Sequence, residues 1–257
     1  MSAQPAEVAP GVYVATAPMY TTTTTIVAGA DGGCLLVDPA VSVADLTALA
    51  GWLSERGLRA AAAWSTHPHW DHLLWSAALG TAPRYATPGA CAVAVRERRG
   101  LVSAVEEAAP GHDLGLFAVV EPLRGVEIDW AGPRAVVYPH DGHAPGHGAV
   151  FLPGTGLLIA GDMVSDIEIP LPDLETADPF GRYRAGLDLL AGIGRVRTVV
   201  PGHGQVGDER EFRRRLAADL AYLDAVEAGA DIADARLTED WLRADHARAL
   251  AFARAAR

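Results

Sequence analysis

Residues 67 to 72 constrain this chain more than any other segment, because they place several potential metal ligands within a few positions. The segment reads His67-Pro68-His69-Trp70-Asp71-His72. It follows the apolar run 60–64, which predicts a buried strand leading into a loop. A single histidine in such a loop is usually a solvated turn residue. Three imidazoles and a carboxylate at this spacing instead predict a metal site at the carboxyl end of a strand, since both groups bind zinc, manganese or iron.

Further candidate ligands lie in the second half of the chain. Asp162 and His203 each closely follow a short apolar run, and His143 and His147 precede one. Glycine stands beside Asp162, His147 and His203, and it allows the backbone to approach a metal closely through a tight turn. Each of these signals is weak alone. In this order, after the first motif, they predict that the two halves of the chain contribute ligands to one site.

The hydrophobic pattern predicts strands and helices in both halves. Strands are expected near residues 12–14, 21–27, 34–37, 60–64, 84–86, 135–138, 149–152, 157–160 and 198–200. Helices are expected near residues 42–56, 72–78, 88–98, 182–193, 208–228 and 237–253. Two proline-interrupted segments, 109–130 and 169–179, have poor periodicity and are expected to be loops near the site.

Composition narrows the class of protein. The chain has 257 residues, half of them hydrophobic, which is enough for a sizeable core. A net charge of -11 argues against a nucleic-acid partner, so a small-molecule substrate is expected. No segment is apolar enough to predict a signal peptide or a membrane span, and the only two cysteines suit a reducing compartment. We therefore expect a cytoplasmic protein without membrane contact; the sequence does not predict its oligomeric state.

The motifs and their order resemble the metallo-β-lactamase superfamily over about residues 12–219, including the Asp38 turn after an apolar strand. The resemblance implies an α+β fold, a four-layer αβ/βα sandwich in which two mixed sheets are flanked by helices. It implies a single domain over 1–257, built from two halves of roughly 1–108 and 131–207, with C-terminal helices in 208–257.

The resemblance also implies a ligand set for two divalent metal ions, with zinc expected and iron or manganese as alternatives. His67, His69 and His147 would hold the first ion. Asp71, His72 and His203 would hold the second, and Asp162 would bridge both. His143 is expected behind the ligands or in the substrate pocket. His112 and His140 are expected at the surface or pocket rim, and His246 on a solvated helix face.

The bridging position separates branches of the superfamily. The best-known dinuclear zinc β-lactamases have cysteine or serine where Asp162 stands, so β-lactam hydrolysis is disfavoured. The bridging aspartate resembles lactonases, glyoxalase-II-like thioesterases and phosphodiesterases, although Ser165 replaces a tyrosine common in quorum-quenching lactonases. The resemblance therefore implies hydrolysis of a small ester, thioester or lactone by a metal-bridging hydroxide, with Asp71 as the catalytic acid or base.

The pocket and two other functions are open at this level. Trp70 and Phe180 are candidate pocket walls, whereas Tyr183 fits a core-facing helix stripe. One alternative function is a mononuclear iron persulfide dioxygenase with the same fold, and another is a pathway-specific metal-dependent cyclase or dehydratase. A metal-free binding protein is the least expected, because every ligand position is filled.

Overall fold

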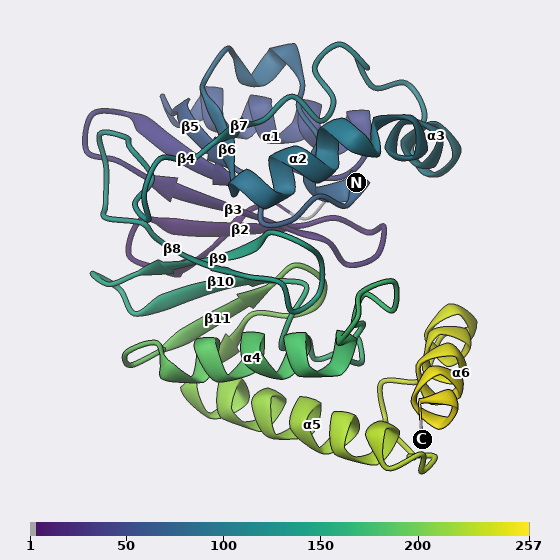
Figure 1. The fold of residues 1–257 in the computed structure, drawn as a ribbon. Coiled ribbons are helices and arrows are strands. Elements are labelled where there is room, and N and C mark those ends of the chain that lie inside the picture. Colours follow the sequence, from purple (N-terminus) through teal and green to yellow (C-terminus); the bar gives the residue numbers. More distant parts are fainter. Residues whose placement is uncertain (1–3, 257) are drawn as a thin grey trace.

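Two β-sheets lie face to face in the structure, with helices covering both outer faces (Figure 1). The structure is a computed structural model that describes residues 4–256. The first sheet has the strand order β1-β2-β3-β4-β5-β6-β7 and the second has the order β12-β11-β10-β9-β8. Both sheets mix parallel and antiparallel pairs. These four layers confirm the predicted fold class.

The first sheet is built from β1 (Ala6–Ala9), β2 (Val12–Thr16), β3 (Thr23–Ala28), β4 (Gly33–Val37), β5 (Arg59–Trp64), β6 (Arg84–Ala86) and β7 (Glu121–Pro122). The second is built from β8 (Val136–His140), β9 (His147–Leu152), β10 (Leu157–Gly161), β11 (Thr198–Pro201) and β12 (Gly207–Asp208). The helices are α1 (Val43–Glu55), α2 (Pro88–Arg96), α3 (Arg98–Ala108), α4 (Pro179–Gly192), α5 (Glu209–Glu227) and α6 (Asp240–Ala255), with two short 3₁₀ turns, Trp70–His72 and Ala77–Leu79.

The central strands are buried on both faces, which explains their continuous apolar runs. In β4, Cys34 and Leu36 pack into the core beneath α1, while Leu35 and Val37 pack between the two sheets. This alternation follows from the two-residue period of a strand. Each strand therefore belongs to two cores at once, and its carboxyl end is held in a fixed position.

The second sheet repeats the arrangement. In β10, Leu157 and Ile159 face the first sheet, while Leu158 and Ala160 pack beneath α4 and α5. The indole Nε1 of Trp64 in β5 donates a hydrogen bond to a carbonyl oxygen in β9 at 2.9 Å. The two sheets are thus joined by a directional bond as well as by apolar packing.

The predicted boundaries hold for most elements and differ in several places. Ser42 caps α1 through a capping box, as its position before the helix predicts. The chain turns at Glu97 and starts α3, where the sequence pattern predicts the end of a helix and no new one. Arg98 fixes this turn by donating to the carbonyl oxygens of Leu114 and Phe117. The short strands β1, β7 and β12 and the 3₁₀ turn at 70–72 were not predicted, and the helix expected near 72–78 is replaced by the short 3₁₀ turn Ala77–Leu79.

α6 is attached to α5 through a buried polar contact. The Nδ1 atom of His246 lies 2.9 Å from the hydroxyl of Tyr222, and its Nε2 atom lies 3.0 Å from Asp231. His246 is buried, so the expectation of a solvated histidine is wrong. A ring with both nitrogens engaged serves here as a link between helices.

The segment between α5 and α6 is held by Arg236. Its guanidinium donates to the carboxylates of Asp219 and Asp234. Arg236 is 8% exposed and Asp219 is 1% exposed. Burial raises the pKa of Asp219 to about 6, against the opposing effect of the Arg236 charge. The Asp219 charge therefore depends on its arginine partner.

Replacing Arg236 with alanine is expected to lower the free energy of unfolding by about 3 kcal/mol, because it leaves a buried carboxylate without its partner. Urea denaturation followed by circular dichroism measures this. Arg210→Ala, at an exposed position of α5, is the matched control and should change stability by less than about 0.5 kcal/mol. Equal stability of the two variants would show that the buried pair does not support the α5–α6 connection.

No helix among residues 4–256 combines the length and apolarity that a membrane crossing requires.

Candidate metal centre

Loops that follow strands of both sheets bring the predicted ligands to one edge of the sandwich. His67 follows β5, Asp162 follows β10 and His203 follows β11. Asp71 and His72 lie in the 3₁₀ turn that begins after His69. Because each strand is anchored in two cores, its following loop starts from a fixed point. The sandwich thereby places side chains from distant parts of the chain in contact.

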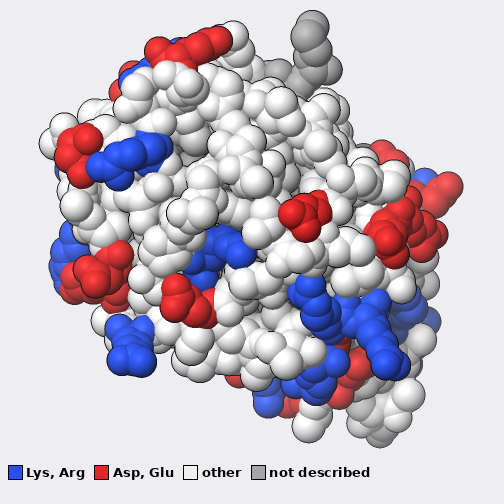
Figure 2. All heavy atoms as spheres, turned by 90° about the horizontal axis from the view of Figure 1, so that it is seen from above, with Lys and Arg blue, Asp and Glu red and all other residues white. Residues whose placement is uncertain are grey.

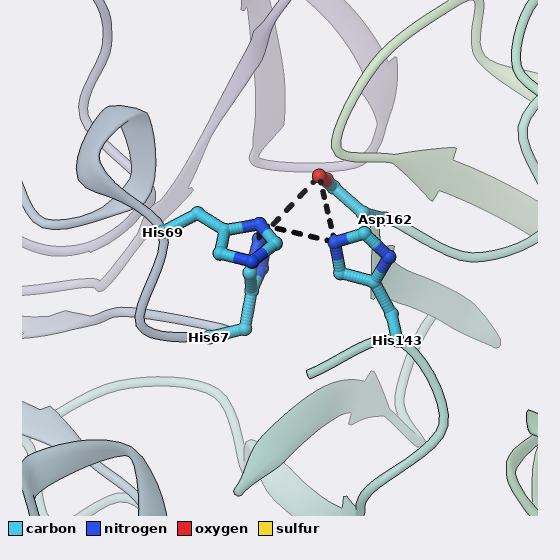
Figure 3. A group of neighbouring side chains, drawn as sticks. All are labelled: His67, His69, His143 and Asp162. Atoms are coloured by element: carbon cyan, nitrogen blue, oxygen red, sulfur yellow. Dashed lines mark hydrogen bonds and ion pairs between the residues drawn. The ribbon is translucent and has the colours of Figure 1, made fainter. Parts of the chain in front are cut away.

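The first group consists of His67, His69, His143 and Asp162 (Figure 3). The Nδ1 atom of His69 lies 3.0 Å from Nε2 of His67 and 3.1 Å from Nε2 of His143. The Oδ2 atom of Asp162 lies 3.4 Å from Nε2 of His67 and 3.6 Å from Nε2 of His143. Three ring nitrogens and one carboxylate oxygen therefore converge on a common point.

The second group consists of Asp71, His72 and His203. The Nε2 atoms of His72 and His203 lie 3.4 Å apart. The Oδ2 atom of Asp71 lies 3.6 Å from the first of these nitrogens and 3.3 Å from the second. All three side chains are buried.

Asp162 connects the two groups. Its Oδ1 atom lies 3.3 Å from Nε2 of His72, and its Oδ2 atom lies 3.3 Å from Nε2 of His203. A Cβ at Gly202 would collide with Oδ1 of Asp162, so the carboxylate fits only against a glycine. Its shared position agrees with the bridging role expected for Asp162.

Among the described residues, the first group contains His143, whereas His147, which the resemblance implies as a ligand, lies outside it with both ring nitrogens buried and without hydrogen-bond partners. His147 is the first residue of β9 and pairs with His140 of β8, so its direction is fixed by the sheet. Its ring stacks against those of His67 and His140, with centroids 5.1 and 4.3 Å away. His143 lies in the preceding loop, which turns it toward His69. The spacing around Pro-Gly alone does not distinguish the two histidines.

Polar partners fix the orientation of the imidazoles. His143 donates from Nδ1 to the carbonyl oxygen of Leu171 at 2.9 Å, and His203 donates from Nδ1 to that of Tyr20 at 3.0 Å. In both rings the Nε2 lone pair then points toward the group. Metal-binding histidines in proteins are typically held by such a bond on the other nitrogen.

Asp38 organises the first motif from behind. Its carboxylate accepts a bond from Nδ1 of His72 at 2.9 Å and one from the hydroxyl of Thr66 at 2.6 Å. The Thr66 hydroxyl also lies 3.0 Å from Nδ1 of His67, so one carboxylate orients both rings. The Asp38 turn is visible in the sequence, but the role of Thr66 is not.

The distances fit a divalent cation. A tetrahedral zinc with bonds of about 2.0–2.1 Å has neighbouring ligands about 3.3 Å apart. The ligand atoms named above are 3.0 to 3.6 Å apart in both groups. The buried Oδ1 atom of Asp162 has no hydrogen-bond partner among the described residues, as expected for a ligand oxygen. Nitrogen and carboxylate donors together suit zinc, iron or manganese.

The charges in the site also favour a cation. Burial opposes the charge on His72, but the carboxylates of Asp162, Asp71 and Asp38 outweigh it and raise its pKa well above the usual value. Burial lowers the pKa of His143 to about 3, which keeps that ring neutral. The acidic side chains thus attract positive charge, and the neutral ring offers a lone pair.

A further acidic side chain, Glu168, lies beside the second group and was not predicted from the sequence. Its carboxylate is close to Asp162 and His203. Burial raises its pKa to about 7. The sequence signal is only a glutamate a few residues after the bridging aspartate, which is not distinctive.

A cleft of about 810 Å³ opens beside the first group, a volume typical of small-molecule sites. His69 and His143 form one end of it. The other walls come from α2 and the start of α3, from the proline-rich segment 170–176, and from α6. The prediction for the segment after residue 169 agrees with this lining. α6 forms the part of the cleft wall that the loop 109–130 was expected to form.

The two predicted aromatic walls lie elsewhere. Phe180 is 6% exposed and packs against Phe252 in the core between α4 and α6. Trp70 is half-buried, with its ring 6.3 Å from that of Tyr20. Neither belongs to the cleft lining. Tyr183 is buried in the helix core, as its spacing predicts.

The two remaining histidines are only partly exposed. His112 lies 2.9 Å through Nε2 from the carbonyl oxygen of Val41. Burial lowers the pKa of His140 to about 4, and its ring stacks on His147 beneath the site. His140 therefore supports the site from below and does not form the pocket rim.

Similarity to known proteins agrees with this site. The family model of the metallo-beta-lactamase superfamily matches residues 18–203, which include both groups. A hydroxyacylglutathione hydrolase from Rhodobacter capsulatus is 30% identical over 198 residues, covering 71% of this chain and 68% of the relative.

Solved structures share the fold. A metallo-beta-lactamase family protein from Thermus thermophilus matches with a TM-score of 0.67 and 24% identity, over 86% of this chain and 82% of its own. A beta-lactamase domain protein from Burkholderia ambifaria matches with a TM-score of 0.69 and 21% identity, over 97% and 86%. TTHA1623, solved in a di-iron-bound form, matches with a TM-score of 0.61 and 27% identity, over 78% and 96%. From the family match over most of its length, this chain belongs to the metallo-beta-lactamase superfamily.

Proposed function

We propose that this protein is a dinuclear metallohydrolase that cleaves a small ester, thioester or lactone. The observation that carries the proposal is the sharing of Asp162 by two groups of ligand side chains. The similarity to a hydroxyacylglutathione hydrolase supports an acyl substrate, since an acylglutathione is a thioester.

In the proposed site, the two groups of ligand side chains would each hold one metal ion. His67, His69 and His143 would hold one metal, and Asp71, His72 and His203 would hold the other. Two divalent cations in such a site supply hydroxide at neutral pH and polarise a substrate carbonyl. Zinc is the metal we expect, while the di-iron relative supports iron as an alternative.

Asp71 is the residue we assign to proton transfer. Its Oδ2 atom faces His72 and His203, and the side chain is 10% exposed. A carboxylate so placed can orient the attacking water and pass its proton to the leaving oxygen or sulfur. The cleft lined by Val93, Leu101 and Leu174 would accept the acyl group.

A small-molecule substrate also suits the surface. Figure 2 shows basic and acidic side chains side by side in mixed groups, with uncharged areas between them. Such mixed charges are typical of a solvated face.

Removal of the metals is expected to lower hydrolysis by about a hundredfold or more, because the nucleophile depends on them. The test is a screen of lactones, thioesters, esters and persulfides on purified protein, with elemental analysis of the same sample. Activity is then measured after chelation and after addition of zinc, iron or manganese. Two metals per chain and recovery of esterase, thioesterase or lactonase activity are expected. One iron per chain with oxygen uptake on a persulfide would contradict the proposal and favour a dioxygenase.

A further inference from the structure

Glu168 places a carboxylate beside the second group without a partner of its own. The side chain is 7% exposed. One of its oxygens lies within 4.8 Å of ligand atoms of Asp162 and His203. Within the described part of the chain, the hydrogen bonds of Glu168 involve only its backbone, and no ion pair reaches its carboxylate. A buried carboxylate needs a hydrogen-bond donor or a cation, because losing its hydration is costly.

Side-chain contacts hold the backbone around Glu168 beside the second group. The hydroxyl of Ser165 accepts bonds from the backbone nitrogens of Ile167 and Glu168, both at 3.1 Å. The same hydroxyl donates to the carbonyl oxygen of His203 at 2.7 Å. One side chain therefore ties the Glu168 segment directly to a residue of the second group.

Arg236 holds the segment from the other side. Its Nη1 atom donates to the carbonyl oxygen of Glu168 at 3.0 Å. The guanidinium charge itself is engaged by Asp219 and Asp234. Arg236 thus positions the Glu168 backbone, while its charge is engaged by the two aspartates and not by the Glu168 carboxylate.

We propose that Glu168 is an additional metal ligand on the side of the second group, where its carboxylate lies with the ligand atoms of Asp162 and His203. The inference rests on the proposed function only in requiring that both groups bind metal. With Glu168, two carboxylates and one imidazole lie together at Asp162 and His203. Asp71 and His72 form the neighbouring group that shares His203, whereas the first group offers one carboxylate and three imidazoles. Carboxylate-rich sets with many ligands favour manganese or ferrous iron, and smaller nitrogen-rich sets suit zinc. The two sites should therefore prefer different metals.

Manganese binding to the full chain tests this assignment. Metal-free protein is titrated with Mn²⁺, and the free ion is followed by electron paramagnetic resonance. The wild-type protein should bind two Mn²⁺ per chain. Glu168→Gln should weaken one of the two sites by about tenfold or more and leave the other unchanged, since one charged ligand is lost. In a parallel titration, zinc affinity should fall less than manganese affinity.

The controls separate a ligand from a structural residue. Glu107→Gln, on the exposed face of α3, should bind manganese as the wild type does. Metal-free Glu168→Gln should melt at the same temperature as the metal-free wild type or higher, because an amide of the same shape avoids the cost of burying a carboxylate. Glu168→Asp, which keeps the charge on a shorter side chain, should bind with intermediate affinity.

Each outcome decides a separate statement. If wild-type protein and Glu168→Gln bind two Mn²⁺ with equal affinities, Glu168 is not a ligand and the proposed function stands. If the metal-free variant melts well below the metal-free wild type, the role of Glu168 is structural and the assignment is overturned. If the wild type binds no metal, the proposed function fails together with the inference.

Discussion

Replacement of Asp162 with asparagine is expected to reduce hydrolysis by about a thousandfold or more, the largest effect of any single substitution considered for this protein. Among the described residues, Asp162 is the only carboxylate that pairs with histidines of both groups. An amide keeps the shape of the side chain but removes the negative charge shared by two cations. The variant should therefore retain fewer than two metals per chain.

The measurement combines turnover of the best substrate from the screen with elemental analysis. Asp188→Asn, at an exposed position of α4, removes a carboxylate from the surface and should leave both quantities unchanged. Circular dichroism establishes that both variants are folded. Full activity and two metals in Asp162→Asn would show that the carboxylate does not bridge.

Replacing His143 and His147, one at a time, should give the second largest effect on hydrolysis, with a contrasting result for each histidine. His143→Ala is expected to remove the first metal and to lower hydrolysis by about a hundredfold or more, because its ring nitrogen faces His69 and Asp162. His147→Leu should retain two metals, because among the described residues His147 lies outside the groups of converging ligand atoms and its ring stacks on His67 and His140.

Metal content is the decisive reading for this pair, since both substitutions touch the interior. His147→Leu is expected to lower thermal stability through lost ring packing while keeping its metals. His143→Ala should show the opposite pattern, with lost metal and little change in the stability of the metal-free protein. A reversed result, with the metal lost only in His147→Leu, would restore the ligand set implied by the sequence resemblance.

Most of the fold is predictable from the sequence because its strands are buried on both faces. Runs such as 34–37 and 157–160 are apolar without interruption, and glycine or proline marks their ends. The start of α3 is less predictable, since it depends on Arg98 reaching carbonyl oxygens more than ten residues away. Hydrophobic periodicity and capping motifs in the sequence cannot show such a long-range contact.

The site is predictable to the level of residue types, and its details depend on tertiary structure. His67, Asp71, Asp162 and His203 come together because each closely follows a strand that ends at the same edge. The choice of His143 over His147 depends on where β9 begins, and a boundary error of a few residues changes it. Glu168 is harder to predict as a site residue, because the contacts of Ser165 and Arg236 that place its segment at the site are not visible in the sequence.

α6 lies beside α5 and outside the two-sheet sandwich, yet it provides one wall of the cleft (Figure 1). If the proposed function holds, the ligand side chains and part of the substrate pocket therefore lie in separate parts of the molecule. Asp245 and Arg248 line the cleft from this helix, outside the strands that precede the ligands. A library of variants on this helix would offer a direct route to altered specificity on an unchanged catalytic frame.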